Sequence, residues 1–152
     1  MSERILIASD HAGFELKKAL EHRLADLGFE VDDLGVDSAE SADYAVYAHP
    51  LAKQVSAGDA ARGVLLCGTG LGMSYTANRY SGVRAAVAWN PEIAKLARSH
   101  NDSNVLVLPA RFLNADQGAA ILEAWLETPF EGGRHSRRIE KIERPDATHG
   151  SP

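Results

Sequence analysis

The fold is decided by residues 63–72, which read Gly63-Val64-Leu65-Leu66-Cys67-Gly68-Thr69-Gly70-Leu71-Gly72. The apolar run up to Cys67 predicts a short strand that is buried on both faces of a sheet. The glycines that follow let the backbone turn sharply, and we expect a helix from about Leu71 to Arg79. The stretch therefore predicts a strand–turn–helix unit, from which parallel sheets are built.

The same alternation of strand and helix recurs along the chain. Asn114 and Gln117 resemble a capping box at the start of the last long helix, whereas Pro50 predicts either a kink or a helix that begins only near His49. The pattern predicts one parallel sheet with helices on both faces, in a single domain over residues 1–152 with a frayed tail from about 145. Further strands are expected at 4–9, from 29, at 83–89 and at 105–108, and further helices at about 16–27, 44–58, 91–98 and 114–125.

The composition excludes several classes of protein. Apolar residues make up 45% of the chain, as in ordinary soluble domains, and no run approaches the ~20 apolar residues of a membrane helix. The net charge of −5 argues against a basic surface for nucleic acid. The single cysteine cannot form an internal disulfide, and the N-terminus lacks the pattern of a signal peptide, so we expect a cytoplasmic protein.

The glycine turn is the strongest local signal. Glycines at positions 68, 70 and 72 can point backbone N–H groups inward, and such a nest binds anions or developing negative charge. The alternative is a tight turn that needs glycine only for packing. The spacing matches neither the phosphate-binding loop that ends in Gly-Lys-Ser/Thr nor the dinucleotide-binding fingerprint.

Cys67 permits two interpretations. A lone cysteine at the end of an apolar strand is usually a small buried hydrophobic residue. Beside a helix N-terminus and two residues from the Thr69 hydroxyl, its thiol can instead become a base or a nucleophile. The residues alone leave both interpretations open.

Two more polar clusters are expected beyond the carboxyl ends of strands, where ligands bind in such sheets. Asp10-His11 can relay protons and bind an anion, or be a helix cap beside a solvent-facing histidine. His100-Asn101-Asp102 can supply an acid/base histidine and an amide, or be a polar loop. Each cluster therefore has a functional and a structural interpretation.

The densest basic cluster contains Arg134, His135, Arg137 and Arg138. Arg134 and Arg138 share one helical face and would make a phosphate clamp, although a solvated helix surface is the more usual explanation of such a cluster. The six histidines show no spacing typical of a metal site, so we expect no metal.

The motifs taken together closely resemble the type B ribose-5-phosphate isomerases, a family that includes galactose-6-phosphate and allose-6-phosphate isomerases. The resemblance extends from about Ile5 to Ile142, and several separate motifs agree with the family in order and spacing. The motifs occupy residues 9–14, 43–44, 67–72, 77–79, 100–102 and 131–135.

The resemblance implies a three-layer α/β/α Rossmann-like domain with a five-stranded parallel sheet of order 2-1-3-5-4 and a C-terminal helix. It also implies a homodimer, able to pair into a tetramer, whose active sites are shared between subunits. His100, Asn101 and Arg111 would come from the partner chain.

The resemblance also implies residue roles in the interconversion of ribose 5-phosphate and ribulose 5-phosphate through a cis-enediolate, without cofactor or metal. Cys67 would shuttle the proton between C1 and C2, Thr69 would activate the thiol, Asp10 would relay protons between the hydroxyls, and His100 would open the sugar ring. The remaining expected contacts to substrate are His11, Tyr44, Gly68, Gly70, Leu71, Gly72, Asn101, Arg111, Arg134 and Arg138.

Departures from the family pattern leave the sugar open. Ala45 stands where the family usually has proline, and Pro109-Ala110 replaces a glycine-led segment before Arg111. Both can reshape the pocket, so isomerisation of a four- or six-carbon sugar phosphate is the nearest alternative. A noncatalytic sugar-phosphate-binding module and a cysteine-dependent transferase are alternatives of other classes.

Overall fold

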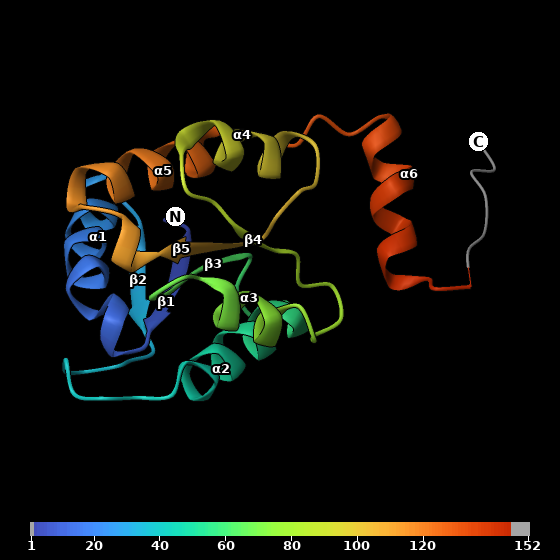
Figure 1. The fold of residues 1–152 in the computed structure, drawn as a ribbon. Helices are drawn as coiled ribbons and strands as arrows, with labels where there is room; N and C mark the ends of the chain where they lie inside the picture. The colour runs from blue at the N-terminus through green and yellow to red at the C-terminus, as the bar shows by residue number, and fades with distance from the viewer. Residues whose placement is uncertain (1, 147–152) are drawn as a thin grey trace.

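The computed structural model describes residues 2–146, and the tail expected beyond 146 lies outside the described residues. One five-stranded parallel sheet has the order β2-β1-β3-β5-β4, as predicted (Figure 1). Its strands are β1 (Arg4–Ser9), β2 (Glu30–Asp33), β3 (Arg62–Cys67), β4 (Ala85–Val87) and β5 (Val105–Pro109). No helix in residues 2–146 is long and apolar enough to cross a membrane.

Two helical layers cover the sheet. One face packs on α1 (Phe14–Asp26), α4 (Pro91–Ser99) and α5 (Ala115–Glu127), and the other packs on α2 (Tyr44–Ala57) and α3 (Leu71–Ala77). Alternate strand residues point to opposite layers. Ile5 and Leu66 belong to the first core cluster, and Leu65 and Cys67 to the second, so the Cys67 side chain faces the α2–α3 layer.

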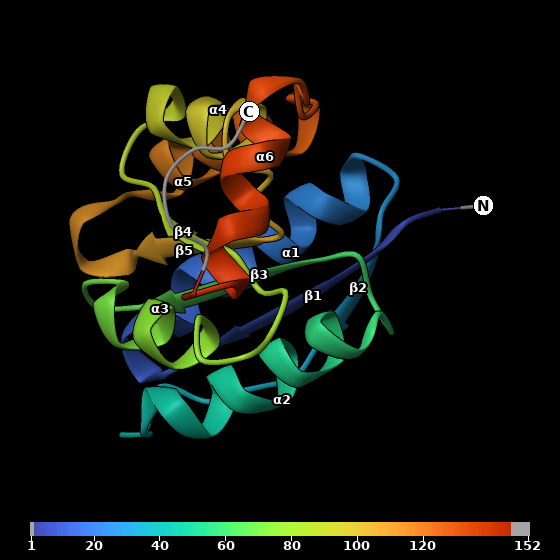
Figure 2. The same ribbon diagram turned by 90° about the vertical axis from the view of Figure 1, so that its right-hand side faces the viewer.

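The final helix, α6 (Arg134–Glu140), stands apart from both layers in Figure 1. Figure 2 looks onto the side of the sheet where β4 lies, with β1 and β3 running across the view, and α6 lies in front of the sheet. Three short 3₁₀ turns complete the described elements: η1 (His11–Gly13), η2 (Ala110–Phe112) and η3 (Lys141–Glu143).

Two elements differ from their predicted extents. The strand expected at 83–89 covers only Ala85–Val87, because it lies at the open edge of the sheet and the Asn78 side chain hydrogen-bonds both the N–H and the C=O of Ala85. The helix containing Pro50 begins at Tyr44, so of the two alternatives the start near His49 was wrong. Pro50 removes the hydrogen bond to the carbonyl of Val46, but both residues are exposed, so water can reach that carbonyl.

A buried lysine holds the loop that follows β2. Lys17 is fully buried, and its Nζ donates to both carboxylate oxygens of Asp33 at 2.6 Å and to the Val36 carbonyl at 2.9 Å. The same loop hydrogen-bonds Ser9 through the carbonyl of Gly35 and the N–H of Val36. Lys17 therefore fixes the chain that flanks the end of β1.

The pKa of Asp33 is lowered below its usual range. Burial alone would raise this pKa, but hydrogen bonds from Glu21, Lys17 and the Gly35 N–H, together with the charge of Lys17, outweigh burial. The ionised carboxylate consequently stabilises the fold above the ordinary carboxyl pKa of about 3.9, and that contribution is lost as the pH falls toward the lowered pKa.

Replacing Lys17 tests this anchor. Lys17→Met should lower the free energy of unfolding by about 3 kcal/mol, because the Asp33 carboxylate loses its buried partner. The loss should not be larger, since the Asp33 side chain is 22% exposed and water can partly replace the lysine. Lys18→Met is the matched control, since the Lys18 side chain is 47% exposed and its Nζ lies 3.4 Å from Asp33 Oδ2, farther than the 2.6 Å of Lys17. Its cost should stay below about 1 kcal/mol in denaturant unfolding. Equal losses in the two variants would refute the anchoring role.

Candidate active site

The parallel pairing of β1 with β3 brings two predicted clusters together at the carboxyl edge of the sheet. Ser9 is in register with Leu66, and the Asp10 N–H donates to the Leu66 carbonyl at 3.2 Å. Asp10 therefore lies beside the end of β3, where Cys67 begins the glycine turn. The Cys67 side chain is buried, with 4% of the residue exposed.

Asp10 and His11 are held by short-range hydrogen bonds. Asp10 is buried, caps η1, and accepts a hydrogen bond from the Gly13 N–H at 3.2 Å. Gly13 is required there because a Cβ would lie 2.7 Å from Cβ of Leu66. Nδ1 of His11 lies 3.1 Å from the backbone N of Ala42 and 3.2 Å from the carbonyl oxygen of the same residue, so Ala42 fixes the position of the ring.

The glycine turn has the backbone geometry that the sequence indicates. Gly70 adopts a left-handed conformation, with φ of 79°, and precedes the first residue of α3. Thr69 Oγ1 accepts a hydrogen bond from the Leu71 N–H at 3.2 Å, so the hydroxyl can still donate its own proton. Activation of the Cys67 thiol by Thr69 remains a prediction.

Tyr44 and Arg111 close over this turn. A Cβ on Gly72 would lie 2.4 Å from Cε1 of Tyr44, and one on Gly68 would lie 3.1 Å from Cδ of Arg111. The Arg111 N–H also donates to the Gly68 carbonyl. The expectation that Arg111 comes from a partner chain is therefore wrong in this structure, because η2 follows β5 directly and carries Arg111 to the turn of its own chain.

His100 and Asn101 lie at the opposite edge of the sheet. They were expected beyond the carboxyl ends of strands, but they end α4 and precede β5, so they lie where the strands begin. The neighbouring Asn104 confirms that this segment lies at the amino edge. Its carbonyl accepts a hydrogen bond from the N–H of Gly63 near the start of β3, and its side chain accepts one from the N–H of Arg84 just before β4. The expectation that this cluster lies beyond the carboxyl ends of strands was therefore wrong, whereas its contribution to the site of a partner chain stays a prediction.

The basic residues of α6 also belong to the amino edge. The segment just before α6 is attached there by a hydrogen bond from the Glu131 N–H to the Ser99 carbonyl. The η3 turn after α6 is attached there as well, because Glu143 Oε1 accepts a hydrogen bond from the Gly82 N–H. Arg134 and Arg138 are exposed on α6. The six residues of β3 separate the two edges by about 20 Å, at about 3.3 Å per residue.

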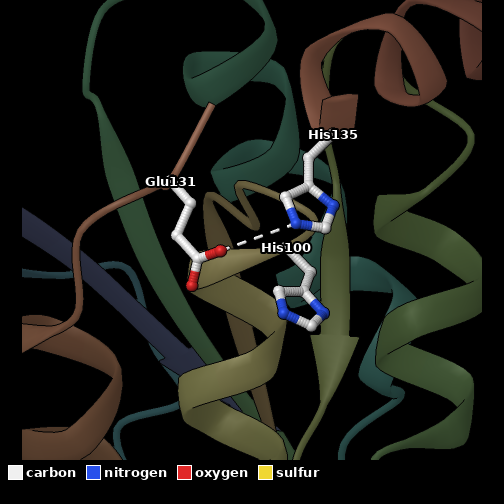
Figure 3. A group of neighbouring side chains, drawn as sticks. All are labelled: His100, Glu131 and His135. Carbon is white, nitrogen blue, oxygen red and sulfur yellow. Dashed lines mark ion pairs between the residues drawn. The ribbon is translucent and has the colours of Figure 1, made fainter. Parts of the chain in front are cut away.

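Three side chains at the amino edge form a cluster that the sequence did not reveal (Figure 3). The rings of His100 and His135 stack with centroids 4.4 Å apart, and Glu131 Oε1 lies 3.6 Å from Nε2 of His135. Desolvation lowers the pKa of His135, and the nearby charges of Arg134 and His100 lower it further. The four-residue spacing of Glu131 and His135 was a signal, but only the fold brings His100 to them.

Comparisons with known proteins agree on one family. Residues 5–142 match the family model described as Ribose/Galactose Isomerase. The chain is 42% identical over 140 residues to ribose-5-phosphate isomerase B of Escherichia coli K12, which covers 92% of this chain and 94% of that protein.

Solved structures give the same result. A ribose 5-phosphate isomerase of Thermotoga maritima matches with a TM-score of 0.91 and 51% identity, covering 94% of this chain and 99% of that one. The Mycoplasma genitalium ribose-5-phosphate isomerase B with bound ribulose-5-phosphate matches with a TM-score of 0.91 and 42% identity, covering 96% and 97% of the two chains.

A pair of glycine substitutions tests the packing of the turn. Gly70→Ala and Gly58→Ala both force alanine into a left-handed conformation, at a cost of about 1–2 kcal/mol. At Gly70 the new Cβ would also lie 3.2 Å from Cγ1 of Val87 and 3.3 Å from Cγ1 of Val107, whereas Gly58 has open space. Gly70→Ala should therefore lower the unfolding free energy more than Gly58→Ala. Equal losses would show that the turn is not tightly packed.

Proposed function

The chain belongs to the ribose/galactose isomerase family, and from this premise we propose that it interconverts ribose 5-phosphate and ribulose 5-phosphate. The observation that carries the proposal is the buried Cys67 at the start of the glycine turn, with Asp10 beside the end of β3 and with Tyr44 and Arg111 packed against the turn. The chemistry is an aldose–ketose isomerisation.

Cys67 acts as the base in this mechanism. Its thiolate removes the proton from C2 of the open-chain aldose, and the electron pair forms a C1–C2 double bond while negative charge develops on O1. Backbone N–H groups of residues 68–72 stabilise the resulting cis-enediolate. Asp10 relays the proton from O2 to O1, and the thiol returns its proton to C1, which leaves the ketose. This sequence requires neither a redox cofactor nor a metal.

The complete site requires two chains. Cys67 and His100 lie at opposite edges of a sheet about 20 Å across, so a small sugar phosphate cannot touch both within one chain. A homodimer, able to pair into a tetramer, would place the amino edge of one chain over the carboxyl edge of the other. The carboxyl edge offers exposed apolar surface for this contact, since Trp89 is 57% exposed and Phe112 is 71% exposed.

The assignment of phosphate ligands follows from this arrangement. His11 and Arg111 hold the phosphate from the chain that supplies Cys67. Arg134 and Arg138 approach from the partner together with His100, which opens the furanose ring, and Asn101, which binds the sugar. Tyr44 lines the sugar pocket against Gly72. The single cysteine suits a reducing compartment, and we place the enzyme in the cytoplasm.

Removal of the thiol tests the base. Cys67→Ala should lower kcat by about 10²–10⁴-fold or more, because the base that moves the carbon-bound proton is lost. In deuterium oxide the unmodified enzyme should place solvent deuterium on C1 or C2, and Cys67→Ala should place none. Calorimetric binding of ribose 5-phosphate should persist in the variant, which shows that its fold is intact. Near-normal turnover, or a covalent Cys67 intermediate in the unmodified enzyme, would contradict the mechanism.

The phosphate clamp is tested on α6. Arg138→Ala should raise KM for ribose 5-phosphate about tenfold or more, since a hydrogen bond between charged groups contributes about 1.5–3 kcal/mol. Arg137→Ala is the matched control, because successive residues of a helix point about 100° apart and the Arg137 side chain therefore leaves α6 in another direction than that of Arg138. The clamp is wrong if the two variants show the same KM in steady-state assays.

A further inference from the structure

The cluster of His100, Glu131 and His135 contains the donor atoms of a metal site. The three residues come from the end of α4, from the segment between α5 and α6, and from the first turn of α6. One possible ligand atom from each lies within 4.8 Å of the others (Figure 3). Two imidazoles and one carboxylate form a ligand set that zinc enzymes use, with a fourth position left open.

The buried side chain of His135 gives an independent sign of a ligand site. Its side chain is only 7% exposed, and its buried Nε2 has no hydrogen-bond partner among residues 2–146. The distance of 3.6 Å to Glu131 Oε1 is too long for a hydrogen bond. Buried polar atoms are nearly always paired, so an unpaired imidazole nitrogen directed at a carboxylate marks the pair as candidate ligands.

We propose that His100, Glu131 and His135 bind a divalent transition metal of the zinc class, and that the bound metal inhibits isomerisation of the ring-closed sugar. The inhibition rests on the proposed function, in which His100 opens the furanose ring. A metal takes the imidazole lone pair that this proton transfer requires, so a chain cannot use His100 for both. The carbon-proton transfer at Cys67 does not depend on that lone pair.

The geometry needs one local adjustment. Tetrahedral zinc with ligands at about 2.0–2.1 Å separates its donor atoms by roughly 3.4 Å, close to the 3.6 Å between Glu131 and His135. The rings of His100 and His135 are nearly parallel, at 15°, so their in-plane lone pairs do not converge. His100 is only half-buried, so its ring can turn about χ2, whereas buried His135 keeps its place.

Neighbouring charge makes the carboxylate essential. The positive charges of Arg134 and Arg138 disfavour positive charge on His135, and they would also repel a metal cation bound to it. Glu131 supplies the only negative charge in the three-residue set, so its removal should weaken binding more than loss of one neutral donor atom. Its side chain is 56% exposed, so the substitution should leave the fold intact.

Metal binding is measured first, without reference to catalysis. Zn²⁺ is titrated against a chromophoric chelator on the Cys67→Ser chain, which removes the competing thiolate. We expect one Zn²⁺ per chain, an affinity lowered at least about tenfold by Glu131→Gln and by His135→Ala, and no change with Glu140→Gln, an exposed acid of α6 outside the cluster. Equal affinity in all four chains, or no binding, would overturn the site.

Inhibition is measured separately on chains that retain Cys67. Zn²⁺ should reversibly inhibit turnover of cyclic ribose 5-phosphate, chelator should restore it, and Glu131→Gln should need at least about ten times more Zn²⁺ for half-inhibition. Binding at the cluster without inhibition overturns the regulatory part. A chain that binds Zn²⁺ at the cluster but never isomerises sugar phosphates refutes the proposed function and leaves the metal site standing. An active chain without cluster binding refutes the metal site alone.

Discussion

The candidate site depends on the parallel pairing of β1 with β3. This pairing sets Ser9 beside Leu66, and the chain beyond each strand then emerges at the same edge. Asp10 and Cys67, which are far apart in sequence, become neighbours for this reason alone. Had either strand run the other way, one of the two residues would lie at the opposite edge, about 20 Å away.

Close packing at the carboxyl edge explains several glycines better than backbone freedom does. Gly13 meets Leu66, Gly68 meets Arg111, and Gly72 meets Tyr44 at distances that leave no room for a Cβ without movement. Of the glycines in the turn, Gly70 alone has the positive φ that favours glycine. The glycine turn therefore serves to bring an arginine and a tyrosine against the backbone beside Cys67.

Much of this architecture could be predicted from sequence. Short apolar runs marked the strands, and the Asn114–Gln117 capping box marked α5 correctly, because both signals are local. The position of His100 was misjudged, although the rule was available: residues that precede a strand of a parallel sheet lie at its amino edge. The contact between Arg111 and Gly68 and the meeting of Glu131 with His100 could not be predicted, because they depend on how distant segments pack.

The central claim is that one active site uses Cys67 of one chain and His100 with Arg138 of another. Mixed dimers test it: Cys67→Ala is combined with a second chain that carries both His100→Ala and Arg138→Ala, each inactive alone. If the site is shared, every mixed dimer contains one intact site, and random mixing should restore about a quarter of the unmodified activity. If mixed dimers form but stay inactive, the residues act within one chain and the account is wrong.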